Sequence, residues 1–182
     1  AQIPFDSIWL GVNHLAHHAS FGYNETTFPE PKKLIGNILA NDRYLLRLSN
    51  SFLPMNVHHQ QFNEASLNGY LVGLNNSIFI SNSLAGRTAF PDFLNEATRK
   101  WWSAQYNYNV DISNANVFYW NNMNDISLKK DVVHYKGVKN KEIHNIYGLL
   151  MSAATSQGLI DRNLQNKEKS HLRPYMVSLD IF

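Results

Sequence analysis

The stretch VFYWNNMNDIS (residues 117–127) changes character in its middle. Its first four residues, Val117 to Trp120, are β-branched or aromatic, which is typical of a buried strand. The strand is followed by amides and a single carboxylate: Asn121, Asn122, Asn124 and Asp125. Many enzymes hold their catalytic acids at the end of a strand. The sequence therefore predicts a candidate site here, with amides in places where a hydrolase would need carboxylates.

Strands and helices alternate on both sides of this stretch. Apolar runs typical of strands cover residues 6–12, 43–49, 114–120 and 173–182. Helical spacing of apolar residues covers 30–42, 91–109 and 141–163, and a short β-excursion is expected over 69–74 and 77–81. Alternation of apolar strands with helices predicts an α/β fold built on a parallel sheet.

Composition narrows the class of protein. The 182 residues, 44% of them hydrophobic, are enough for one globular unit with a core. The net charge of +2 and the lack of an aromatic-interleaved basic run argue against nucleic acid as a partner. No apolar run reaches the length of about 18 residues that a membrane span needs. The absence of cysteine excludes disulfides and thiolate metal sites.

Several segments together resemble one enzyme family. YWNNMNDIS, HYKGVKNKEIHNIYGLLMSAATSQGL and RPYMVSLDIF are similar, in order, to the core block of glycoside hydrolase family 31, and IPFDSIWLGVNH and FPDFLNEATRKWW extend the likeness upstream. These motifs are similar to those of α-glucosidases of the glucosidase II catalytic-subunit type. The resemblance implies a (β/α)₈ TIM barrel, which needs about 250 residues. Residues 1–182, with about four βα units and a β-rich insertion around 55–90, are then expected to be a fragment of the catalytic barrel.

The resemblance also assigns a role to Asn122. Family members retain configuration and need two carboxyl groups, a nucleophile and an acid/base. The nucleophile is the Asp of the family's W-x-D-M-N-E motif, and that position is Asn122 here. A neutral amide is a poor nucleophile and cannot stabilise the oxocarbenium charge as a carboxylate does. The acid/base of the family lies beyond Phe182, outside this sequence.

Other positions where the family holds its substrate also differ. In this sequence Trp120 and Met123 keep the family's residue, and Asp125 stands where the family has Glu. The positions that the resemblance marks as vestigial for substrate binding are Trp120, Met123, Asp125, Gly11, Asn50, Leu84 and Leu179. Each loss removes a charge, a bidentate hydrogen-bonding group or a stacking face. Losing several such contacts, at about 1–3 kcal/mol each, would abolish ordinary binding as well as chemistry.

The leading hypothesis is therefore a catalytically inactive family member, a pseudoenzyme that acts through binding or assembly. One alternative is an active α-glucosidase that hydrolyses α-linked glucose, as in glucosidase II trimming of N-glycans, with Asn122 an introduced substitution. A second is a lectin-like carbohydrate-binding module. The resemblance implies no cofactor and no metal. It implies the secretory pathway as location, and as partners the remaining barrel segments of the same polypeptide, a partner subunit and a glycan.

Two further groups of residues have both a functional and a structural interpretation. The histidines His14, His17, His18, His58 and His59 could be metal ligands, but a surface or loop role is favoured because no carboxylate accompanies them. Trp101 and Trp102 could stack on a sugar, but at least one is expected in the helix–sheet core. Trp120 is the best candidate for a residual sugar contact, and Asn122 is expected to be a buried amide bonded to neighbouring strand ends.

Overall fold

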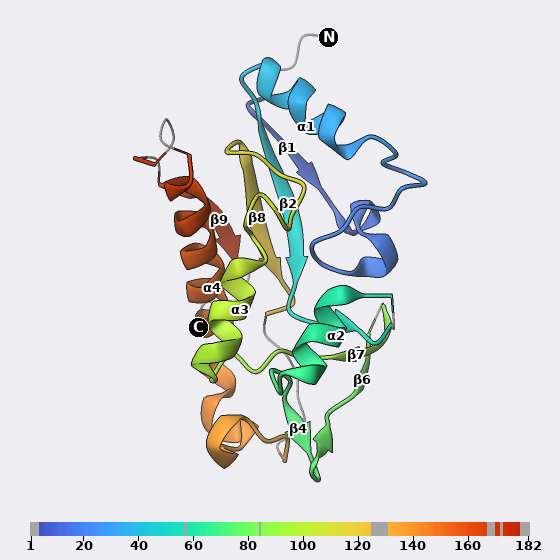
Figure 1. Cartoon of the computed structure of the whole chain (residues 1–182), viewed down its shortest axis with the longest axis vertical. Coiled ribbons are helices and arrows are strands. Elements are labelled where there is room, and N and C mark those ends of the chain that lie inside the picture. Colours follow the sequence, from blue (N-terminus) through green and yellow to red (C-terminus); the bar gives the residue numbers. More distant parts are fainter. Residues whose placement is uncertain are drawn as a thin grey trace.

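The computed structural model describes residues 4–56, 58–83, 85–124, 131–166, 170–171 and 173–178. Its centre is a four-stranded sheet in the order β1–β2–β8–β9 (Figure 1). The strands are β1 (Ser7–Leu10), β2 (Tyr44–Asn50), β8 (Val117–Asn122) and β9 (Met176–Ser178). All three pairings are parallel, which confirms the predicted α/β class. The described strands form an open sheet, as expected for a fragment of a TIM barrel.

Three helices connect the parallel strands. They are α1 (Pro31–Ala40), α3 (Glu96–Ala104) and α4 (Asn140–Leu164), and α3 and α4 pack side by side (Figure 1). Pro31 opens α1, where its fixed φ suits the first turn. Helix α3 is shorter than the predicted 91–109 because Asn95 caps it: the Asn95 side chain accepts a hydrogen bond from the Ala97 N–H at 3.0 Å. No described helix has the length and apolar character needed to cross a membrane.

The segment between β2 and α3 is an insertion of short elements. It contains β3 (Leu53–Pro54), α2 (Gln60–Leu67), β4 (Gly73–Leu74), β5 (Ser77–Ile78), β6 (Ser81–Ser83) and β7 (Gly86–Ala89). The predicted β-excursion is confirmed as the β4–β5 hairpin. Helix α2 was not predicted, because its eight residues bury only Gln61, Phe62 and Ala65 and no side chain caps its start. Short 3₁₀ turns at Val12–His14, Ala16–His18 and Tyr135–Gly137 complete the described elements.

The two faces of the sheet have different surroundings. In β8 the residues alternate between buried and half-buried, so Val117, Tyr119 and Asn121 face the helices. Phe118, Trp120 and Asn122 point to the opposite face, in register with Leu46, Leu48 and Asn50 of β2. Trp9 and Tyr44 lie on that same face and are 55% and 43% exposed. Within the described residues, this aromatic face therefore lacks the cover that the interior of a complete barrel would give it.

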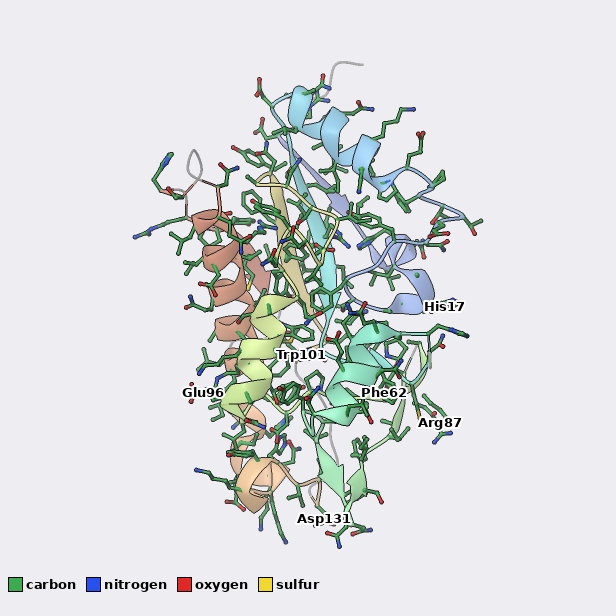
Figure 2. The ribbon with its side chains drawn as sticks, in the orientation of Figure 1. His17, Phe62, Arg87, Glu96, Trp101 and Asp131 are labelled. Atoms are coloured by element: carbon green, nitrogen blue, oxygen red, sulfur yellow. The ribbon has the colours of Figure 1, made fainter. Side chains whose placement is uncertain are left out.

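The paired tryptophans of α3 have separate structural roles. Trp102 is fully buried and donates from Nε1 to Thr155 Oγ1 of α4 at 3.0 Å. Trp101 is half-buried and donates to Glu64 Oε2 of α2 at 3.0 Å, so it joins α3 to the inserted helix that carries Phe62 (Figure 2). The prediction that at least one of the two lies in the helix–sheet core is confirmed.

Gly158 allows α3 and α4 to approach closely. A Cβ built at this position would lie 2.5 Å from the Ser103 carbonyl oxygen, and the Ser103 hydroxyl donates to the Ala154 carbonyl at 2.7 Å. We expect Gly158→Ala to destabilise the protein by about 1–3 kcal/mol, because backbone must move to admit the methyl group. The matched control is Gly36→Ala in α1, where no atom lies within 4 Å of the added carbon. It should be neutral or stabilising by up to about 1 kcal/mol, through higher helix propensity. Equal denaturant midpoints for the two variants would contradict this packing argument.

Candidate active site

The carboxyl ends of β1, β2 and β8 meet at one edge of the sheet. Gly11 follows β1, Asn50 is the last residue of β2 and Asn122 the last of β8. Asn50 and Asn122 are register partners on neighbouring parallel strands. This edge is where TIM-barrel enzymes place their active sites. The structure therefore brings two of the predicted site residues together, on the face that would be the barrel interior.

Asn50 and Asn122 form a hydrogen-bonded amide pair. Asn122 Nδ2 donates to Asn50 Oδ1 at 3.1 Å, and Asn50 Nδ2 donates to the His18 carbonyl at 3.1 Å. The backbone of Asn50 is held by Ser20, whose hydroxyl accepts from the Asn50 N–H at 2.8 Å and donates to its carbonyl at 3.2 Å. Asn50 is 1% exposed. The pair is neutral, and its internal bond fixes the orientation of both amides.

Asn121, and not Asn122 as predicted, is the fully buried amide at the end of β8. Asn122 is bonded to a neighbouring strand end, as predicted, but it is only half-buried. Asn121 is the fully buried amide, because strand alternation turns it toward the helices. Its side chain donates to Ser152 Oγ at 3.4 Å and accepts from Thr155 Oγ1 at 3.3 Å, both in α4. Asn121 therefore anchors the end of β8 to the helix layer.

The chain after β8 is fixed to the strands on both sides. Met123 has a left-handed backbone, with φ of 54°, and its side chain is 42% exposed. Its carbonyl accepts a hydrogen bond from Ser51 Oγ, just beyond β2. Asn124 is fully buried and donates from Nδ2 to Ser178 Oγ of β9 at 2.7 Å. Ser20 and Ser51 support the site without having been predicted, because each acts on a partner 30 or more positions away in sequence.

Trp120 lies one layer below the amide pair. It is half-buried, and its ring meets Trp9 edge to face with centroids 4.7 Å apart. Its Nε1–H is buried and has no hydrogen-bond partner among the residues the structure describes.

Gly11 precedes the 3₁₀ turn Val12–His14 with φ of −75°, and no atom lies within 4 Å of a Cβ built there. The remaining predicted site residues, Leu84, Asp125 and Leu179, lie outside the described residues.

Of the surface or loop role favoured for the histidines, His14 has the loop position but not the surface exposure. His14 is 1% exposed, its Nδ1 lies 2.6 Å from the Gly11 carbonyl, and its ring packs against Tyr23 at 5.7 Å. Burial, followed by the charge of Arg47, lowers the pKa of His14 to about 4. The 3₁₀ turn after β1 points the ring inward, which spacing alone does not reveal. The described residues contain no group of three or more His, Asp or Glu placed to hold a metal ion.

Comparisons with known proteins agree with this geometry. The family model described as "Glycosyl hydrolases family 31 TIM-barrel domain" matches residues 1–182. Mouse neutral alpha-glucosidase AB is 30% identical over 172 residues, which cover 89% of this chain and 18% of the relative. A probable glucan 1,3-alpha-glucosidase of rice is 28% identical, over 100% of this chain and 20% of its own length.

A solved structure shows the same fold. In the crystal structure of the ER glucosidase II heterodimeric complex, one chain superposes with a TM-score of 0.91 and 24% identity, over 98% of this chain and 20% of that chain. The 182 residues thus span about a fifth of the length of these relatives. The match of the family model over the whole chain, with its parallel strands and helices, shows that the chain belongs to family 31 of the glycosyl hydrolases, as part of its TIM-barrel domain.

Proposed function

We propose that this chain is part of a family 31 α-glucosidase-like protein that has lost hydrolysis and acts through binding or assembly. The observation that carries the proposal is the amide pair. Asn122 occupies the position that the resemblance assigns to the nucleophile, and its side-chain N–H donates a hydrogen bond to Asn50. Asn50 stands, by the same resemblance, at the Asp of the family's D-P-H segment, which is distinct from the acid/base. An attacking carboxylate is thereby replaced by a neutral amide engaged with another amide.

Retaining hydrolysis explains why this exchange matters. The first step forms an ester between the enzyme's carboxylate and the sugar, and a positive charge develops on the sugar ring before the bond forms. An amide oxygen carries no full negative charge, so it supplies little electrostatic stabilisation to that charge. The described residues at these strand ends, Gly11, Asn50, Trp120, Asn122 and Met123, are all uncharged. These described residues therefore offer no carboxylate that could replace the nucleophile.

Assembly is the second part of the proposal. We propose that other segments of the same polypeptide complete the barrel over the aromatic face that carries Trp9 and Tyr44. A partner subunit is proposed because the matched glucosidase II structure is a heterodimer of a catalytic subunit and the binding domain of a regulatory subunit. We also propose a location in the secretory pathway, either in the lumen of the endoplasmic reticulum or outside the cell, which the same likeness supports.

Turnover of an α-glucoside by the complete protein is the direct test. We expect no hydrolysis by the natural sequence and none by Asn122→Asp, because Gly11, Leu84 and Leu179 also depart from the family's substrate-holding residues. An active family 31 α-glucosidase in the same assay is the positive control. Hydrolysis by the natural sequence overturns the proposal. Recovery of hydrolysis in Asn122→Asp does so as well, because it would mean that the rest of the pocket works and that Asn122 is the single defect.

A lectin-like function is the second candidate, and Trp120 is the observation that favours it. Its half-buried ring lies beside Trp9 on the face that would be the barrel interior, where a sugar could stack against it. If the complete protein binds α-glucosides without cleaving them, Trp120→Leu, which removes the aromatic face, should weaken binding about 5- to 10-fold, as expected for a stacking contact of about 1 kcal/mol. Calorimetric titration measures this change. Equal affinities would remove Trp120 from the binding site.

A further inference from the structure

Two short segments of this chain have the sequence Asn-x-Ser/Thr, the acceptor triplet for N-linked glycosylation. They are Asn24-Glu25-Thr26 and Asn75-Asn76-Ser77. In a chain rich in asparagine such triplets also arise by chance, so the triplet alone does not assign a site. A glycan is bulky and hydrated, and it has to remain outside the folded protein. The surroundings of each asparagine in the structure therefore distinguish the two triplets.

Asn24 is held within the fold. It is half-buried, and its side-chain oxygen accepts a hydrogen bond from the Thr26 N–H at 3.0 Å. Its own backbone N–H donates to the His14 carbonyl at 2.8 Å, and its carbonyl accepts from the Phe28 N–H at 2.7 Å. A side chain that closes its own turn in this way has a structural role. This triplet is therefore accounted for without a glycan.

Asn75 lies at the tip of the β4–β5 hairpin, which projects at the lower end of the molecule in Figure 1. Asn75 and Asn76 form the two-residue loop between the strands, with φ of 51° and 61°. Positive φ at both positions is the pattern of a type I′ turn. Asn75, Asn76 and Ser77 are all exposed. No hydrogen bond between described residues uses the side chain of Asn75 or of Ser77.

The base of the hairpin is fixed to the rest of the domain. The Gly73 N–H donates to the Val133 carbonyl at 2.9 Å, and the Val133 N–H donates to the Gly73 carbonyl at 2.8 Å. The Phe79 N–H donates to the Val72 carbonyl at 2.9 Å, and both of these side chains are buried. The hairpin thus presents a defined tip on a packed base. A sugar on Asn75 would extend from this tip without replacing any hydrogen bond of the described residues.

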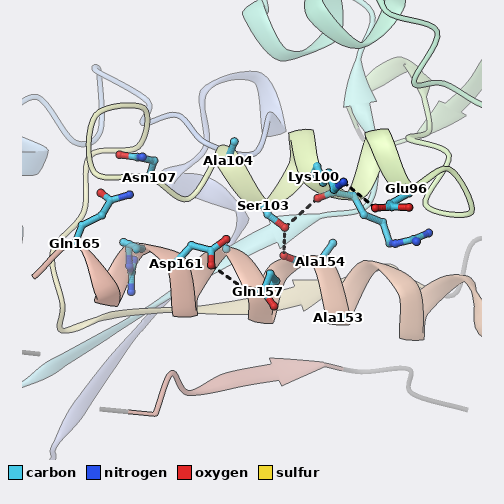
Figure 3. Close-up of a pocket in the computed structure, with 13 residues that line it drawn as sticks. Glu96, Lys100, Ser103, Ala104, Asn107, Ala153, Ala154, Gln157, Asp161 and Gln165 are labelled. Atoms are coloured by element: carbon cyan, nitrogen blue, oxygen red, sulfur yellow. Dashed lines mark hydrogen bonds and ion pairs between the residues drawn. The ribbon is translucent and has the colours of Figure 1, made fainter. Parts of the chain in front are cut away.

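The turn accounts for the two asparagines but not for Ser77. Asn tolerates a left-handed backbone better than most residues, so the turn by itself favours Asn at both loop positions. Ser77 begins β5, and strands favour β-branched and aromatic residues. A serine with a structural role looks different: the Ser103 hydroxyl donates to the Arg99 carbonyl at 2.9 Å and to the Ala154 carbonyl at 2.7 Å (Figure 3). The exposed Ser77 hydroxyl has no such bond within the described residues, so it is available as the third residue of an acceptor triplet.

We propose that Asn75 is a site of N-linked glycosylation. The inference rests on the proposed location in the secretory pathway, because the transferase acts in the lumen of the endoplasmic reticulum. The donor is an oligosaccharide joined to a lipid diphosphate. The side-chain nitrogen of Asn75 forms a bond to the anomeric carbon of the first sugar and loses one proton. The bond from that carbon to the phosphate oxygen breaks, and the lipid diphosphate leaves with its electron pair. The Ser77 hydroxyl, two residues along the chain, is the group by which the triplet is recognised.

Expression of the complete protein in eukaryotic cells, with an added signal sequence that directs it to the lumen, tests the site apart from the natural location. A flexible tail that carries Asn-Gly-Thr is appended and reports entry into the lumen. We expect peptide N-glycosidase in heavy-oxygen water to convert Asn75 to labelled Asp, which mass spectrometry of the peptide detects. Asn75→Gly and Asn76→Gly are a matched pair, because glycine accepts the turn at both positions and only the first removes the acceptor. Asn75→Gly and Ser77→Ala should each lose the electrophoretic shift of one glycan, and Asn76→Gly should keep it.

Two results would overturn the proposal. One is an unmodified Asn75 in the lumen-directed protein whose tail is glycosylated. The other is an equal number of glycans on Asn75→Gly and on the natural sequence. The same protein without the added signal tests the location separately. If its tail then carries no glycan, the proposed location is wrong, while the lumen-directed protein still decides whether Asn75 is an acceptor.

Discussion

Asp111→Asn is expected to destabilise the protein by about 3–5 kcal/mol, which is the usual cost of removing one partner of a buried ion pair. The substitution keeps the shape of the side chain and removes its charge. It leaves Arg47, at 1% exposure, as an uncompensated cation behind the sheet. Tyr119 adds to the effect, because its hydroxyl donates to Asp111. Burial, and then the charge of Asp111, raise the pKa of Tyr119 well above its usual value, so this hydroxyl stays protonated and available as a donor.

Chemical denaturation of the complete protein, following the unfolding of this domain, measures the change. The exposed pair Lys33–Glu30, at 3.0 Å, supplies the control: Glu30→Gln should cost no more than about 1 kcal/mol, because both side chains are in water. The double substitution Arg47→Met with Asp111→Leu should recover much of the loss, since it removes both buried charges. If Asp111→Asn costs no more than Glu30→Gln, or if the double variant is as unstable as the single one, the cost does not arise from an unpaired charge.

The sheet and its main helices follow from periodicity in the sequence, and the finer elements do not. Apolar runs and 3.6-residue spacing predict β2, β8 and α4, because β2 is buried over six consecutive residues, β8 at every second residue and α4 along one side. Helix α2 has no such face and no capping side chain, so its sequence resembles a loop. The ends of α3 depend on local hydrogen bonds of Asn95 and on turns after Ala104, which outweigh helical spacing of the flanking aromatic residues.

The candidate site divides in the same way. The alternation of strands and helices predicts that the site lies at the strand ends. The sequence also shows directly that Asn50 and Asn122 are amides. Their pairing depends on strand order and register, which a single sequence does not contain. The Arg47–Asp111 pair joins residues 64 positions apart, and nothing in either segment signals the other. The pairing of such distant buried charges can be identified only from the three-dimensional structure.

Protonation of His14 is expected to make stability fall as the pH is lowered from about 6.5 to about 4. Burial, then Arg47, lowers the folded-state pKa of His14 to about 4, whereas an unfolded chain has the ordinary value near 6.5. Between pH 6.5 and pH 4, His14 is protonated in the unfolded state and neutral in the folded state. Lowering the pH over this range therefore favours unfolding. Below about pH 4 both states are protonated and the loss stops growing. A difference of this size corresponds to a loss of up to about 3 kcal/mol.

His14→Phe isolates this contribution, because it keeps an aromatic ring against Tyr23 and Phe28 and removes the titrating group. The variant should lose the Gly11 contact at every pH, yet its free energy of unfolding should change less between pH 7 and pH 4 than that of the natural protein. His59, whose pKa is also lowered by burial, titrates in both proteins and accounts for part of the remaining slope. Gly36→Ala, which removes no titrating group, is the control and should leave the slope unchanged. Denaturant titrations at half-unit pH steps measure all three. Parallel curves for His14→Phe and the natural protein would mean that His14 takes up its proton at the same pH in the folded and unfolded states, and is therefore not held neutral by its burial.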